Sequence, residues 1–364
     1  MAPPWPTAAW AESSPAAQGV DPAALAQLDS EFASGRYGYV NGFLVIRHSA
    51  VVFDRSYTHD YASLFASAPD QKRGPYNYYD PSWHPYYEGG LLQTMQSVSK
   101  SVTSALIGIA LYRGELSSID SNVLPFLADY RLPADPLRQK WTIRHLLTMS
   151  AGIKWEEVAL PYSDPNNTCA QMEAAQDWVQ FVLDQPQVAE PGATFVYNSG
   201  ATQLLSQVLK HATGMHADAY AQAYLFKPLG ISSYYWKHTP TGHADTEGGL
   251  YLTPRDLAKI GYLFLRGGVW DGTRILAEEF VRASAMTQIS TGADSRGLDY
   301  GFQWWVERRP EGAAYAALGY GGQRLIVIPD LDLVAVFTGW NIFATPPLDT
   351  RFAIERLRQM VQRR

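Results

Sequence analysis

The feature of this sequence that most constrains its fold is the wide separation of its β-like segments. Residues 42–57 alternate apolar and polar side chains around a central turn, which predicts a β-hairpin early in the chain. Further β-like runs come only near the end, at 300–306, 313–319, 324–328 and 333–338. The middle of the chain has mostly helical patterns, so strands and helices do not alternate as β-α-β units. The order predicts an α+β fold, with an antiparallel β-sheet drawn from both chain ends, flanking helices and an inserted, mostly helical subdomain.

Helix start and stop signals divide the remaining sequence. Asp21-Pro22 and Thr253-Pro254 each place a capping side chain before a proline suited to the first helical turn. Other helical patterns cover 142–148, 171–183, 202–212, 217–225 and 348–361.

These patterns also predict how the chain is divided into subdomains. We expect an extended N-terminal arm at 1–20, rich in Pro, Ala and Ser. Residues 21–105 and 241–364 are expected to form the sheet subdomain, and residues 106–240 the helical one. The aromatic and proline-rich segment 75–87 cannot form a regular helix and is either a wall of the site or a packed surface loop.

Composition excludes several classes of function. The formal net charge of −6 gives no electrostatic footprint for nucleic acid. Cys169 is the single cysteine, and no His or Cys spacing typical of a metal site occurs, so we expect neither a metal nor a cofactor. No apolar run is long enough to span a membrane. The compartment is periplasmic or secreted if a signal peptide has been removed, and cytoplasmic otherwise. The oligomeric state is left open.

The chemistry of the chain is expected to centre on Ser97-Val98-Ser99-Lys100, which opens an apolar helical pattern. Residues three apart on a helix share one face, so Lys100 lies within reach of the Ser97 hydroxyl. A serine is a weak nucleophile until a base takes its proton, and the N–H groups at a helix start can hold an oxyanion. Ser-x-x-Lys is a signature of serine enzymes that react with penicillins. The alternative for these four residues alone is an ordinary surface helix.

Two further elements complete the candidate site. Tyr197 precedes a helical pattern, and a phenol beside a cationic lysine can carry the Ser97 proton to a leaving group. Gly321-Gly322-Gln323 lies between two β-like runs, where the Gln323 N–H is expected to join the Ser97 N–H as an oxyanion donor. Taken singly, Tyr197 is equally compatible with a structural role, and the glycines with a simple hairpin turn.

Together these three elements, in this order, resemble the serine β-lactamase and penicillin-binding-protein superfamily, and most closely its class C-like branch. That branch includes family VIII carboxylesterases and aminohexanoate-dimer hydrolases. The resemblance implies a β-lactamase/transpeptidase-like fold, with Ser97 as acyl-forming nucleophile, Lys100 as its base and Tyr197 as the third catalytic residue. It also places Tyr320, Gly321 and Gly322 on the substrate-binding strand.

The resemblance also implies roles for other residues. Tyr162 resembles a tyrosine that closes over the substrate in aminohexanoate-dimer hydrolases. Glu247 lies where relatives line the cleft, and it either meets a substrate amine or is a solvated surface glutamate. Ser199 is also placed among the substrate-binding residues, where it replaces an asparagine that contacts a substrate amide. Tyr320 replaces a lysine that holds a carboxylate, and both replacements depart from the pattern of the superfamily.

The predicted function is cleavage of small-molecule esters or small amides by a serine hydrolase through an acyl-enzyme. The departures argue against efficient activity as a β-lactamase or D-peptidase, which stays one alternative. Acyl transfer through the same acyl-enzyme remains an alternative, and so does a non-catalytic sensor or scaffold.

Overall fold

The main architectural element of the computed structural model is an eight-stranded sheet with the strand order β1-β3-β2-β13-β12-β11-β10-β9. The structure describes residues 5–66, 91–292, 297–309, 312–342 and 348–361. All neighbours in the sheet are antiparallel except β1 and β3. The strands are β1 (Ala11–Glu12), β2 (Val40–Arg47), β3 (Ala50–Ser56), β9 (Leu298–Tyr300), β10 (Trp305–Glu307), β11 (Tyr315–Gly319), β12 (Gln323–Ile328) and β13 (Leu333–Gly339).

Smaller strands lie outside this sheet. They form a three-stranded sheet of β4 (Gln93–Thr94), β5 (Tyr235–Trp236) and β6 (Leu250–Leu252), and a hairpin of β7 (Val269–Trp270) and β8 (Thr273–Arg274).

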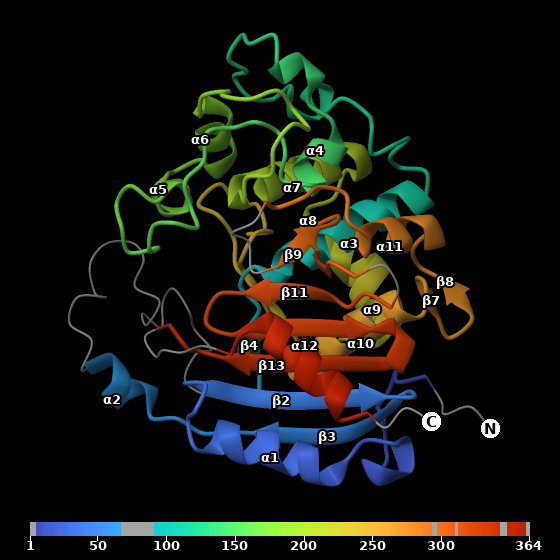
Figure 1. Cartoon of the computed structure of the whole chain (residues 1–364). Helices are drawn as coiled ribbons and strands as arrows, with labels where there is room; N and C mark the ends of the chain where they lie inside the picture. The colour runs from blue at the N-terminus through green and yellow to red at the C-terminus, as the bar shows by residue number, and fades with distance from the viewer. Residues whose placement is uncertain (1–4, 67–90, 293–296, 310–311, 343–347, 362–364) are drawn as a thin grey trace.

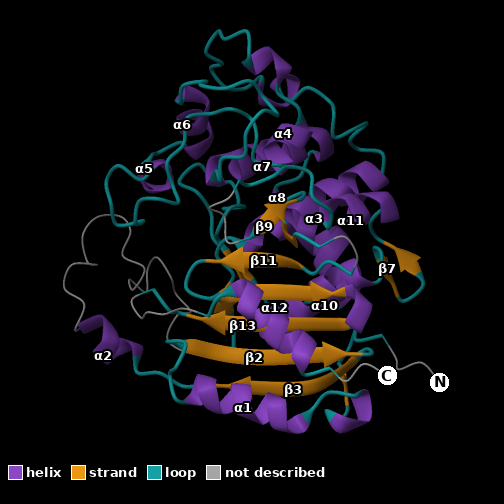
Figure 2. Ribbon diagram, viewed as in Figure 1, coloured by secondary structure: helices purple, strands orange, loops and turns teal. Residues whose placement is uncertain are grey.

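Helices gather into groups around the sheet (Figure 1). The helices are α1 (Pro22–Ala33), α2 (Tyr61–Ala66), α3 (Val98–Tyr112), α4 (Ile143–Leu147), α5 (Thr168–Ala174), α6 (Trp178–Asp184), α7 (Ser199–Thr213), α8 (Ala217–Ala221), α9 (Lys227–Leu229), α10 (Pro254–Leu265), α11 (Glu278–Ser284) and α12 (Thr350–Gln359). Figure 2 shows α4, α5, α6 and α7 together at one end of the molecule, beyond the sheet. The prediction of an α+β fold with helices flanking an antiparallel sheet is confirmed.

The sheet separates two hydrophobic cores, because successive residues of a strand face opposite sides. In β12, Leu325 and Val327 belong to the core that contains α3 and α10, whereas Ile326 and Ile328 belong to the core that contains α1 and α12. Strand β12 is therefore apolar on both faces, as the continuous apolar run 325–328 indicates.

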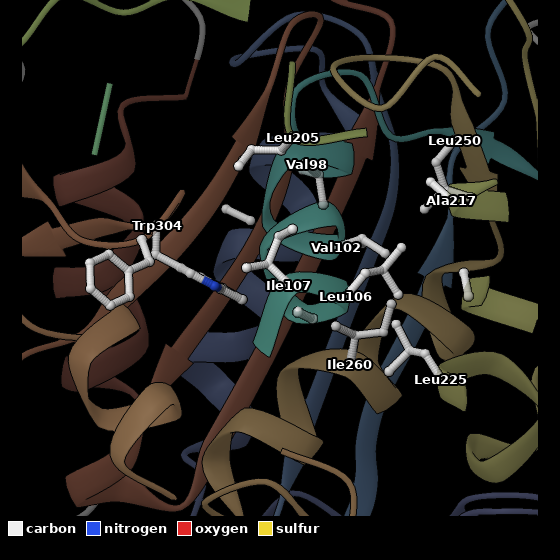
Figure 3. Packing of buried hydrophobic residues seen from close by; sticks show 14 of the residues in the cluster. Val98, Val102, Leu106, Ile107, Leu205, Ala217, Leu225, Leu250, Ile260 and Trp304 are labelled. Carbon is white, nitrogen blue, oxygen red and sulfur yellow. The ribbon is translucent and has the colours of Figure 1, made fainter. Parts of the chain in front are cut away.

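Helix α3 is the buried axis of the larger core. Figure 3 shows Leu106 directed toward Ile260 and Leu225, with Trp304 on the other side of the helix. Leu106 and Trp304 are fully buried, and burying one such side chain stabilises the fold by roughly 1.5–3 kcal/mol. The helix is therefore a rigid support for the residues at its N-terminus.

Several sequence predictions are confirmed, and two need correction. The hairpin 42–57 and the capped helix starts at Asp21 and Thr253 are present. The single helix predicted at 171–183 is wrong: the chain breaks after α5, and the Asp177 side chain accepts the Gln180 N–H to start α6. The single strand predicted at 300–306 is also wrong, because a turn at 301–304 separates β9 from β10.

Two other expectations are not tested by the fold. The segment 75–87 lies outside the described residues. The limits of the arm and of the two subdomains stay a prediction. Within the part of the chain that the structure describes, we find no helix long and apolar enough to cross a membrane.

Candidate active site

Ser97 lies at the start of α3, where backbone geometry fixes its position. It is the N-cap residue, and its carbonyl accepts the Lys100 N–H at 3.1 Å. The preceding residue, Gln96, has a φ of 47°, in the left-handed region that side-chain-bearing residues rarely adopt. The Gln96 amide group donates to Thr94 Oγ1 at 2.9 Å and so holds this turn. Strained backbone of this kind is typical of functional sites.

Lys100 brings its ammonium group to Ser97 from one helical turn away. Its Nζ donates to Ser97 Oγ at 2.8 Å, to the Glu247 carbonyl at 2.8 Å and to Glu247 Oε2 at 2.9 Å. The residue is 1% exposed. Burial alone lowers the pKa of Lys100, but the Glu247 carboxylate, together with Tyr197, Glu157 and Cys169, raises it well above its usual value. The lysine is therefore an ammonium ion at neutral pH.

Tyr197 completes the group around Ser97. Its hydroxyl hydrogen-bonds Ser97, and its ring centroid lies 5.4 Å from Lys100 Nζ. The ring stacks on Trp305, with centroids 5.8 Å apart. Burial raises the pKa of Tyr197, and the nearby ammonium of Lys100 opposes that rise. The structure thus brings Ser97, Lys100 and Tyr197 together.

The glycine turn between β11 and β12 lies beside the segment that leads into α3. A Cβ atom on Gly319 would lie 2.3 Å from the Met95 carbonyl oxygen, so only glycine permits this approach. Gly321 and Gly322 have φ values of 83° and 108°, which side-chain-bearing residues rarely adopt. The Gln323 side chain is 1% exposed and bonds to the backbone of Gly339, so the backbone is the part of Gln323 that remains a candidate oxyanion donor.

Two predicted substrate contacts, Tyr162 and Tyr320, lie against each other. Their ring centroids are 5.0 Å apart in an edge-to-face arrangement. Both residues are partly exposed, and the Tyr162 hydroxyl donates to Glu157 at 3.0 Å. Glu157 thus holds the hydroxyl of Tyr162, while the Tyr162 ring contacts Tyr320 in the turn between β11 and β12.

Glu157 is a buried carboxylate that sequence reasoning missed. It accepts hydrogen bonds from Trp155 Nε1 at 2.7 Å and from the Ser199 N–H at 2.9 Å, in addition to Tyr162. The Ser199 hydroxyl donates to it as well, at 2.6 Å. Four donors pointing at one carboxyl group are the pattern of an ionised acceptor. In the sequence, the acidic pair Glu156-Glu157 directly after Trp155 is the feature that could have indicated a buried carboxylate here.

The predicted contact between Ser199 and a substrate amide needs correction. Ser199 is fully buried, and both its N–H and its hydroxyl are bonded to Glu157. The residue therefore links the start of α7 to the 155–162 segment and does not present a group to a substrate.

The predicted contact between Glu247 and a substrate amine also needs correction. Glu247 is 4% exposed and forms the ion pair with Lys100 described above. Despite burial, the Lys100 ammonium and a hydrogen bond with the Glu173 carboxyl lower the pKa of Glu247 to about 2. The carboxylate is thus paired with Lys100 and is not available to a substrate amine.

A potential ligand cluster lies behind this ion pair. Cys169, Glu173 and Glu247 each offer an atom within 4.8 Å of the others. The Cys169 thiol donates to Glu247 Oε1 at 4.0 Å. A metal cation there would compete with the Lys100 ammonium for the same carboxylate, and we assign no ion to these residues.

Comparison with known proteins agrees with this geometry. The family model described as Beta-lactamase matches residues 36–349, which is most of the chain. The chain belongs to the beta-lactamase family. The match confirms the superfamily that the Ser97, Tyr197 and Gly321-Gly322 elements predicted.

Three similar proteins share little sequence identity with this chain. The 6-aminohexanoate-dimer hydrolase of Paenarthrobacter ureafaciens is 26% identical over 301 residues, covering 73% of this chain and 70% of the relative. A solved structure from Bacillus anthracis, provisionally named as a 6-aminohexanoate-dimer hydrolase, has a TM-score of 0.69 at 20% identity and covers 92% of this chain and 79% of its own. EstCE1, described as a hydrolase with promiscuous acyltransferase activity, has a TM-score of 0.65 at 16% identity, with coverage of 93% and 97%. The structural matches bear on the fold alone.

Proposed function

We propose that this beta-lactamase-family protein is a serine hydrolase that cleaves small esters and short amides through an acyl-enzyme on Ser97. The observation that carries the proposal is the 2.8 Å contact between Lys100 Nζ and Ser97 Oγ at the start of a buried helix. Nucleophile, nitrogen base and helix N-terminus are then combined at one point.

The proposed reaction has two steps. In the first, Ser97 Oγ bonds to the substrate carbonyl carbon while the neutral form of Lys100 takes the hydroxyl proton. The oxyanion is held by the backbone N–H groups of Ser97 and Gln323. Tyr197 passes the proton to the leaving alcohol or amine as the old bond breaks. In the second step, water attacks the acyl-enzyme and gives its proton to the same Lys100–Tyr197 pair. The pair returns this proton to Ser97 Oγ as the bond between Oγ and the acyl carbon breaks, which releases the free acid.

The substrate-binding assignments follow from the strand turn. We propose that the acyl group of the substrate lies against Tyr320, Gly321 and Gly322. Tyr162 packs against Tyr320 and adds to this side of the site. Tyr320 offers no positive charge for a carboxylate, so we expect β-lactams and cell-wall peptides to be poor substrates. The 6-aminohexanoate-dimer hydrolase similarity supports short amides as a second substrate class.

Turnover of p-nitrophenyl butyrate tests the proposal. The wild type should hydrolyse the ester, and Ser97→Ala and Lys100→Ala should each lower kcat/KM by at least about a thousandfold. Ser117→Ala, at a solvent-exposed serine hydrogen-bonded to Ser121, is the matched control. A Ser97→Ala protein with wild-type activity would refute the assigned nucleophile.

Acyl transfer is the second candidate: EstCE1, which shares this fold, is described as a hydrolase with promiscuous acyltransferase activity. If an added alcohol or amine speeds ester turnover and yields a new conjugate, the acyl-enzyme is intercepted by acceptors other than water. If the free acid is the only product at every acceptor concentration, the acyl-enzyme reacts with water alone.

A further inference from the structure

The ammonium group of Lys100 is fully engaged in a buried ion pair. Two of its three hydrogen bonds go to Glu247, one to the carbonyl and one to Oε2. The side chains of Lys100 and Glu247 are 1% and 5% exposed, so water does not screen the pair. An ammonium ion has three N–H donors and no lone pair. In this state Lys100 donates to Ser97 and has no lone pair with which to accept its proton.

Glu247 is held in place by the segment around it. The Thr103 hydroxyl of α3 donates to the Thr246 carbonyl at 3.0 Å, and the Leu250 N–H donates to Ser99 Oγ at 3.2 Å. Segment 246–250 is therefore bonded on both sides of Glu247 to the same helix that carries Lys100. The backbone of Glu247 cannot move away from α3 without breaking these bonds, which keeps its side chain within reach of Lys100.

Other charged and titratable groups face the pair from several elements. Tyr197, Glu157 and Cys169 act on Lys100, and all three favour its ammonium form. Behind Glu247, the Glu173 carboxyl of α5 hydrogen-bonds the Glu247 carboxylate, and burial and that neighbour raise the pKa of Glu173. Asp245, paired with Lys237 at 3.6 Å, is the next acidic group. Glu173 therefore keeps its proton and acts as a donor, which leaves Glu247 as the anion that faces Lys100.

We propose that Glu247 is a positioning residue that keeps Lys100 in its ammonium form in the free enzyme, so that Ser97 gains a free base only at alkaline pH. This inference rests on the proposed function. At alkaline pH, Lys100 loses one proton to solvent, and its lone pair takes the Ser97 proton as the Oγ–carbon bond forms. That proton leaves through Tyr197 with the alcohol or amine. Glu247 stays ionised throughout and never touches the substrate.

The rate at which a fluorophosphonate labels Ser97 tests this inference between pH 5 and 10.5. The reaction forms an Oγ–phosphorus bond and releases fluoride, and its pH dependence reports the free enzyme. In the wild type the rate should rise with pH, and the midpoint of this rise should lie at or above about pH 10.4, the value of an unperturbed lysine, because Glu247 raises the pKa of Lys100. In Glu247→Gln the anion is gone while burial remains, so the midpoint should fall by more than about one pH unit.

The pH profile separates this role from a purely structural one. If Glu247→Gln only loses packing, its maximal labelling rate should fall while the midpoint of its pH profile stays that of the wild type. That result would overturn the inference. Glu190→Gln is the matched control, because Glu190 forms a surface pair with Lys140 in which both side chains are about half exposed. Its profile should coincide with that of the wild type.

Two outcomes do not depend on the folding of the variant. A wild-type midpoint near pH 6–7 would overturn the inference even if Glu247→Gln fails to fold. Absence of Ser97 labelling at every pH would instead overturn the proposed function, and this inference with it.

Discussion

Replacing Glu157 by Gln tests whether the buried carboxylate beneath the site organises it. The carboxylate accepts four hydrogen bonds at 2.6–3.0 Å from Trp155, Tyr162 and Ser199. Glutamine keeps the shape and can still accept from the two N–H donors, while its amide group can donate to the two hydroxyls. All four bonds lose the charge on the acceptor, and a hydrogen bond to a charged group is worth about 1 kcal/mol more than a neutral one. The expected loss is about 2–4 kcal/mol in the free energy of unfolding.

Urea unfolding at pH 7 measures that loss. Glu156→Gln is the matched control, because Glu156 is adjacent and exposed, and its side chain accepts one backbone N–H at 3.2 Å. It should change the free energy of unfolding by less than about 0.5 kcal/mol. If Glu157→Gln is as stable as Glu156→Gln, the carboxylate does not carry the hydrogen-bond energy assigned to it.

Three further predictions concern the strand turn, the sheet core and the ion pair. Gly319→Ala should lower kcat/KM for p-nitrophenyl butyrate at least about tenfold, since its Cβ would meet the Met95 carbonyl oxygen and push β11 away from Ser97; unchanged kinetics would contradict this. Gly261→Ala should cost about 1–3 kcal/mol of stability by overpacking α10 against β12 and β13, measured by urea unfolding, and a stabilised variant would contradict it. Because Lys100 lowers the pKa of Glu247 to about 2, the stability that this ion pair contributes is present above about pH 4.5 and is lost as the pH falls toward 2. The difference in unfolding free energy between wild type and Glu247→Gln should therefore shrink by roughly 1–3 kcal/mol from pH 6 to pH 2.5, and a constant difference would contradict the pairing.

Much of the fold could be predicted from local sequence patterns, because helix caps and strand alternation are determined by residues that are neighbours in the sequence. The cap at Asp21 and the alternation at 42–57 depend on residues next to one another, and both elements are present. The break between α5 and α6 was missed because the apolar spacing continues through Ala175. Only the Asp177 side chain, which accepts the Gln180 N–H, shows that a new helix begins.

The site was predicted in part for the same reason. Ser97 and Lys100 lie three residues apart on one helix, so their contact follows from helical geometry. The role of Glu247 depends on a contact across 147 residues, and that of Glu157 on a contact with Ser199 across 42 residues. Neither contact has a local signature, because each joins segments that are far apart in the sequence and meet only in the folded chain.

The central claim is that Ser97 carries the acyl group, and mass spectrometry tests it most directly. The protein is mixed with p-nitrophenyl butyrate, quenched in acid within the first turnovers and digested. The account predicts a butyryl adduct on the peptide that contains Ser97, absent from Ser97→Ala and from acid-treated enzyme without ester. An adduct on another residue, or unimpaired turnover by Ser97→Ala, would contradict it.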